Sequence, residues 1–91
     1  FGGKNPYPIL FAENVQVEKL RELRGGHLQL KLSQSGSPVF PAIAFGMADA
    51  KKLIDRERKK VSVAFEPIWN VYNGSKSIQL LIKAICENPA H

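Results

Sequence analysis

Aromatic and basic side chains lie close together around an Asn-Gly pair in the C-terminal third of the chain. Trp69 and Tyr72 precede Asn73-Gly74, and Lys76 follows it. Aromatic rings stack on the faces of nucleobases and an ammonium group meets phosphate, so this combination can bind single-stranded nucleic acid. Both aromatic residues also suit a structural role as cross-strand partners in a hairpin. We favour that role for both, more strongly for Tyr72, and keep both as candidates.

Further candidates for contact with a polyanion lie in the first half of the chain. Arg21 and Arg24 border an expected turn, where guanidinium groups suit both phosphate contact and stacking. His27 follows this turn, Lys31 lies on the polar face of the next strand, and Phe40 lies at the start of the third. A structural alternative remains open for each of these residues. An arginine can pair with Glu22, which lies between the two, and His27 can be an ordinary turn residue. Lys31 can simply keep its face solvated, and Phe40 can be covered by other parts of the chain. The formal net charge of +5 favours a polyanionic partner.

Hydrophobic periodicity predicts the elements that hold these side chains. Alternating apolar residues and turn signals indicate five strands, over residues 9–23, 27–32, 39–45, from 61 onward and around 78–82. The first strand changes parity between Val17 and Leu20, which indicates a bulge. In the third strand Val39, Ile43 and Phe45 share one face; Phe40 lies on the other, either exposed for stacking or covered by the N-terminal segment.

A short helix interrupts the strands. Ala50, Leu53 and Ile54 recur at helical spacing after Gly46, and basic residues follow them. The order of elements is therefore three strands, a helix and two strands. This order predicts an all-β fold, a five-stranded Greek-key OB barrel with one short helix between strands 3 and 4. A five-stranded SH3-like barrel is the nearest alternative, and the helix argues against it.

The composition describes one globular domain. The chain is 44% hydrophobic and 23% charged over 91 residues, which excludes a disordered segment. It has no apolar run near the roughly 18 residues of a membrane helix, and no signal peptide, so we expect no membrane partner. The single Cys86 fits a reduced, cytoplasmic compartment. We expect a piece of a longer protein, with an extended segment at 1–8 leading from upstream domains, the OB domain at 9–87 and a tail at 88–91.

Several short motifs, in order along nearly the whole chain, resemble one family. They are Phe1-Gly2 with Asn5-Pro6 and Pro8, then Ala42 to Met47, then Asn70 with Tyr72-Asn73-Gly74 and Gln79-Leu80. Together they resemble the OB domain that follows the catalytic core in RecJ-type single-strand-specific exonucleases. Lys4, Tyr72 and Ala84 stand where that family has Gly, Trp and Asp.

The resemblance implies a C-terminal OB-fold domain of a 5′-to-3′ single-stranded-DNA exonuclease used in repair and recombination. In such enzymes other domains carry the chemistry, with divalent metal bound through an Asp-His-His motif. This chain has no such motif, and its carboxylates are scattered singly, so we expect no catalysis, no metal and no small-molecule cofactor here. The expected partners are single-stranded DNA and the upstream catalytic domains of the same chain.

Two other functions remain open. The barrel can act as a scaffold that packs against the catalytic domains with little DNA contact, through an exposed apolar patch near Ile68 and Leu81. An OB domain that binds RNA or an oligosaccharide is compatible with the aromatic residues alone, but not with the family motifs.

Overall fold

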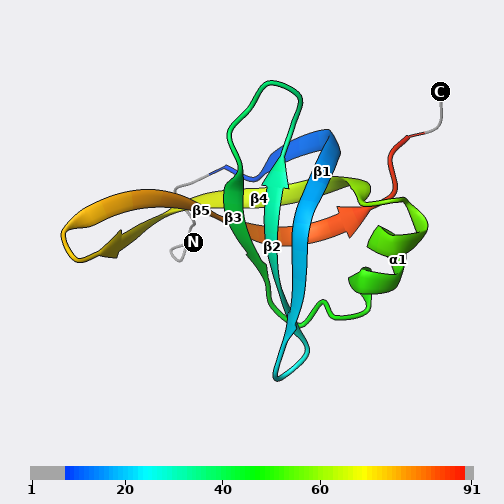
Figure 1. The fold of residues 1–91 in the computed structure, drawn as a ribbon, viewed down its shortest axis with the longest axis horizontal. Helices are drawn as coiled ribbons and strands as arrows, with labels where there is room; N and C mark the ends of the chain where they lie inside the picture. The colour runs from blue at the N-terminus through cyan, green and yellow to red at the C-terminus, as the bar shows by residue number, and fades with distance from the viewer. Residues whose placement is uncertain (1–7, 90–91) are drawn as a thin grey trace.

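The computed structural model describes residues 8–89, and these form a closed five-stranded barrel with one helix (Figure 1). The strands are β1 (Leu10–Leu23), β2 (His27–Ser33), β3 (Phe40–Ala44), β4 (Lys60–Tyr72) and β5 (Ser75–Cys86), and the helix α1 (Ala50–Arg56) lies between β3 and β4. The strand order is β1-β2-β3-β5-β4, closing on β1, and only the β3–β5 contact is parallel. The predicted OB barrel is confirmed. Most of the expected N-terminal segment, residues 1–7, and the tail residues 90–91 lie outside the described part.

Regular alternation of leucines builds the wall of the core. Leu28, Leu30 and Leu32 on β2 are all buried, as the sequence predicts. Ile54 on α1 is fully buried as well, so the helix packs its apolar side on the end of the barrel. In the described part of the chain, α1 is too short and too polar to cross a membrane.

The inward face of β3 differs from the expected one. Ala42 and Ala44 are fully buried, whereas Phe45 on the opposite parity is exposed. Ala42 lies between Leu30 on β2 and Leu80 on β5 in the register, both buried, so a small side chain fits between two large ones. Phe40 shares the inward parity and packs partly buried against the core, so of its two alternatives the exposed position on the outer face is not the one that the structure shows.

β1 is long because it pairs with two strands, and two register shifts allow it to coil around the barrel. One shift lies between Val17 and Lys19 opposite β2, where the sequence predicts a bulge. The second lies between Ala12 and Val15 opposite β4, where Asn14 adopts a positive φ of 57°. The backbone N–H of Asn14 donates to Oδ1 of Asn88 at 2.8 Å, which ties the bulge to the segment after β5.

β4 and β5 continue past the barrel as a two-stranded arm (Figure 1). β4 pairs with β1 only as far as Phe65, but it pairs with β5 as far as Tyr72. The turn at the tip holds Asn73 at φ 52° and Gly74 at φ 80°, the positive values that a tight Asn-Gly hairpin turn requires. Trp69 pairs with Ile78 inside this ribbon, which is the cross-strand position that its structural role requires.

Candidate nucleic-acid interface

The structure divides the predicted site residues between two faces. Arg21 and Lys31 lie on the outer face of the β1–β2 sheet, where both are exposed. Trp69 and Lys76 lie on the arm, on the face that continues the barrel interior, because Trp69 pairs with Ile78 and Ile78 packs on the core. All four are candidates for contact with DNA from the sequence alone, but the fold places them on two different faces.

The outer face carries a compact group of cations. Lys19 lies directly opposite Lys31 in the β1–β2 register, and Arg21 lies opposite Gln29. All four side chains are exposed. Lys19 is not among the residues predicted from the sequence, because the bulge just before it changes which residues of β1 point outward. The change of parity that predicts this bulge was the available signal. We call Lys19, Arg21 and Lys31 the outer-face cations.

The outer-face cations lack acidic partners among the residues that the structure describes. Ion pairs within 4.0 Å hold Lys51 to Glu22 and Lys83 to Glu66, but no carboxylate within residues 8–89 approaches an outer-face cation this closely. Like charges directly opposite in a sheet repel each other. A bound polyanion would relieve that repulsion, and this relief would favour its binding.

An exposed aromatic ring stands at the end of the outer face. Phe45 directly follows β3 and is 60% exposed. Its ring meets the ring of His27 edge-on, with centroids 5.3 Å apart and planes at 80°. The backbone N–H of Gly46 donates to Nδ1 of His27 at 2.9 Å, so the imidazole is held in place beside the phenyl ring. Sequence reasoning missed Phe45 because it assigned the wrong inward face to β3.

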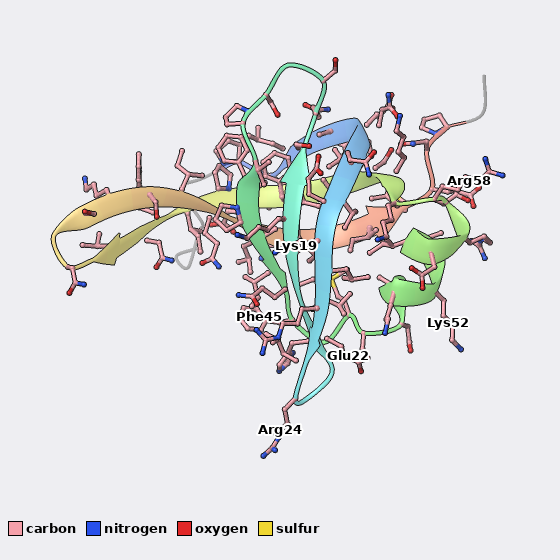
Figure 2. All side chains as sticks on the ribbon, in the orientation of Figure 1. Lys19, Glu22, Arg24, Phe45, Lys52 and Arg58 are labelled. Carbon is pink, nitrogen blue, oxygen red and sulfur yellow. The ribbon has the colours of Figure 1, made fainter. Side chains whose placement is uncertain are left out.

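The turn between β1 and β2 is anchored at its base and free at its tip. Ala48 N–H donates to the carbonyl of Gly26 at 3.1 Å, and Lys51 of α1 pairs with Glu22. Arg24 extends from the tip of this turn into solvent, as Figure 2 shows. The structure therefore brings His27 close to Phe45 and leaves Arg24 in solvent at the tip of the adjoining turn.

The arm carries a second aromatic–basic pair. The Nζ of Lys76 lies 5.3 Å from the centroid of the Trp69 indole, a cation–π geometry, and Trp69 is 59% exposed. Val71, two residues further along β4, is exposed on the same side. The backbone of Tyr72 ends β4, and its side chain lies outside the described part of the structure.

The inner face of the arm leads into an apolar cleft in the barrel wall. The cleft has a volume of about 340 Å³ and is lined largely by apolar side chains, among them Leu10, Phe40, Phe65, Pro67 and Ile78. Phe40 therefore contributes to this cleft and does not join the outer-face cations. Within residues 8–89, no group of three or more His, Cys, Asp or Glu side chains is placed to hold a metal ion.

Comparisons with known proteins agree with this architecture. A family model described as the RecJ OB domain matches residues 1–84. A search of curated proteins gave no match. Among solved structures, the chain is similar to the mitochondrial single-stranded DNA binding protein Rim1 of S. cerevisiae, with a TM-score of 0.63 and 18% sequence identity. That alignment covers 93% of this chain and 99% of the other.

Proposed function

Since the chain belongs to the RecJ OB-domain family, we propose that it is a non-catalytic module that binds single-stranded DNA. In this proposal it is the C-terminal OB domain of a cytoplasmic 5′-to-3′ single-strand-specific exonuclease of DNA repair and recombination. It holds the substrate for a nuclease core in upstream domains, where divalent metal performs the hydrolysis.

The observation that carries the proposal is the group of outer-face cations beside an exposed ring. OB barrels bind oligonucleotides on the face of strands 2 and 3 and with the loops between strands 1 and 2 and between strands 4 and 5. Lys31 lies on that face, Arg24 lies in the first of those loops, and Phe45 directly follows strand 3. The printed name of Rim1, a single-stranded DNA binding protein of the same fold, supports this choice of ligand.

The cations and the aromatic ring contact different parts of the nucleotide. Lys19, Arg21 and Lys31 contact backbone phosphates, and one base stacks on the exposed face of Phe45. Neither contact reads a base edge, so we expect little sequence preference. Release of counterions from the phosphates makes the affinity fall steeply with salt.

The test is a titration of labelled single-stranded oligonucleotide with the chain. We expect binding at low salt, a steep salt dependence, and a loss of about 1–3 kcal/mol for Phe45→Ala, the usual value for one stacked base. Phe45→Tyr is the matched control, because it keeps an aromatic face at the same position. No binding at low salt, or equal affinity of the alanine and tyrosine variants, contradicts the proposal.

A docking role has one observation in its favour. The apolar cleft lined by Phe40 continues onto the exposed Trp69 and Val71, which is the kind of surface that a neighbouring domain covers. Ile68 and Leu81, the residues expected to form such a patch, are partly buried.

The two functions differ in what they require of Lys31. If the outer face binds the substrate, Lys31→Ala weakens DNA binding by the parent enzyme. If the arm docks on a catalytic domain and the barrel contributes little to substrate binding, Lys31→Ala leaves DNA binding by the parent enzyme unchanged.

A further inference from the structure

We infer that single-stranded DNA continues from the outer face across β1 to a second group of cations at the turn between α1 and β4. This inference rests on the proposed function and extends it, because it assigns a path to the strand beyond strands 2 and 3. The second group comprises Arg58, Lys59 and Lys60, which we call the turn cations.

The turn cations are free of acidic partners in the described part of the chain. Arg56, just before them, pairs with Glu57 at 3.9 Å and with Glu87 at 3.7 Å. No carboxylate within residues 8–89 lies within 4.0 Å of the three side chains that follow. All three are exposed, and Figure 2 shows Arg58 extending into solvent on the side of the molecule that carries α1.

The turn cations lie next to the outer-face cations along β1. Lys60 pairs with Gln16 in the β1–β4 register, and the carbonyl of Lys59 accepts a 2.7 Å hydrogen bond from Val17 N–H. Gln16 is three residues from Lys19 on the same strand. With a rise of about 3.3 Å per residue and about 4.8 Å between strands, the Cα atoms of Lys19 and Lys60 are roughly 11 Å apart. A single polyanionic strand can contact both groups.

A groove borders the turn cations at Lys60. It has a volume of about 410 Å³, and its lining includes Lys60, Asn14, Gln16 and Gln34, together with the apolar Val39. Amide side chains can donate hydrogen bonds to phosphate and sugar oxygens. The groove also contains the carboxylate of Glu18, which accepts a 2.6 Å hydrogen bond from Ser33 Oγ. Lys60 and the neighbouring amides can bind a sugar–phosphate backbone, provided that its phosphates pass away from the Glu18 carboxylate.

The backbone of the turn allows charge to be removed without loss of the fold. Arg58 and Lys59 have φ values of 57° and 64°, a region that glycine adopts more readily than other residues. The double variant Arg58→Gly/Lys59→Gly therefore removes two cations and leaves the unfolding midpoint in urea unchanged or raised. The matched control is Arg56→Gln/Lys83→Gln, which also removes two charges, but charges that lie outside both groups and already pair with carboxylates.

The experiment compares single-stranded oligonucleotides of about 4 and about 16 nucleotides, the shortest and longest sites of one OB fold, because a strand that also crosses the roughly 11 Å to Lys60 needs more than the shortest site. The turn variant binds the short oligonucleotide like the unmodified chain and the long one several-fold more weakly. For the long one its log–log salt slope falls by about 1.4, which is two contacts at about 0.7 each. Lys60→Gln, which leaves the positive-φ residues in place, shifts the slope in the same direction by about half as much.

Three results overturn the inference. The first is that the turn variant binds the long oligonucleotide with the same affinity and salt slope as the unmodified chain. That result leaves the proposed function intact and leaves the turn cations available to a protein partner. The second is equal weakening at both lengths. The third is equal weakening by the control pair, which means that net charge alone acts. If the unmodified chain binds neither oligonucleotide, the proposed function fails as well, so the two failures are distinguishable.

Discussion

Two lysines that face each other on the outer face should affect stability and DNA binding in opposite directions. Lys19 and Lys31 are direct register partners on β1 and β2. At a charge separation of about 7 Å in water, their repulsion is about 0.6 kcal/mol, and salt near 0.1 M screens roughly half of it. A net penalty of a few tenths of a kcal/mol matches the usual cost of like charges at opposed positions.

The expected result is a non-additive gain in stability. Either Lys19→Gln or Lys31→Gln removes the repulsion, so each single variant raises the free energy of unfolding by a few tenths of a kcal/mol. The double variant gains no more than a single one from this source, because the pair is already broken. Urea denaturation measured at low and high salt checks this, since the gain should shrink as salt rises.

DNA binding should respond additively to the same substitutions. Each lost phosphate contact lowers the log–log salt slope by about 0.7, so the double variant loses about 1.4. Between about 50 and about 200 mM salt, the advantage of the unmodified chain then shrinks about sevenfold. Lys52→Gln, an exposed cation on α1 away from Phe45 in Figure 2, is the control and should change neither quantity by as much. An unchanged slope in the double variant, or an additive stability gain, refutes the reasoning.

Two further predictions test how the structure holds the interface in place. Gly25→Ala should weaken DNA binding more than Gly26→Ala. Both substitutions place alanine at a positive φ, but only at Gly25 does the new Cβ lie 3.1 Å from the imidazole of His27, which contacts Phe45. Oligonucleotide titration of the two variants measures the difference in affinity. Asn88→Ala should cost about 1–3 kcal/mol of unfolding free energy in urea, because it leaves the buried hydroxyl of Ser62 without its 2.8 Å partner. If Ser62→Ala/Asn88→Ala is as unstable as Asn88→Ala alone, that hydrogen bond does not explain the loss.

Local patterns in the sequence were enough to predict most of the elements. Leu28, Leu30 and Leu32 alternate strictly, so only one face of β2 can be buried. Asn73-Gly74 requires positive φ at both positions, and the structure shows it. Both signals depend only on residues that are close together in the sequence, so a single sequence is enough to detect them.

Properties set by distant partners could not be predicted in the same way. β3 has apolar residues on both faces, so its inward face is decided by barrel closure against Leu30 and Leu80, which favours the small Ala42. That choice buries Phe40 partly and exposes Phe45. The contact between Asn14 and the segment after β5 spans 74 positions, and no local pattern announces it.

The separation of the candidates onto two faces makes DNA binding and docking compatible in one domain. The outer-face cations and Phe45 lie on the outer surface of β1, β2 and β3, while Trp69 and the apolar cleft lie along the inner face of the arm. If the chain is part of the proposed exonuclease, a catalytic domain that covers the cleft does not cover Lys31. In that enzyme Lys31→Gln and Phe45→Ala should weaken DNA binding and spare the domain packing, whereas Trp69→Ala should do the reverse. Loss of both properties in either variant would mean that the two faces act as one surface.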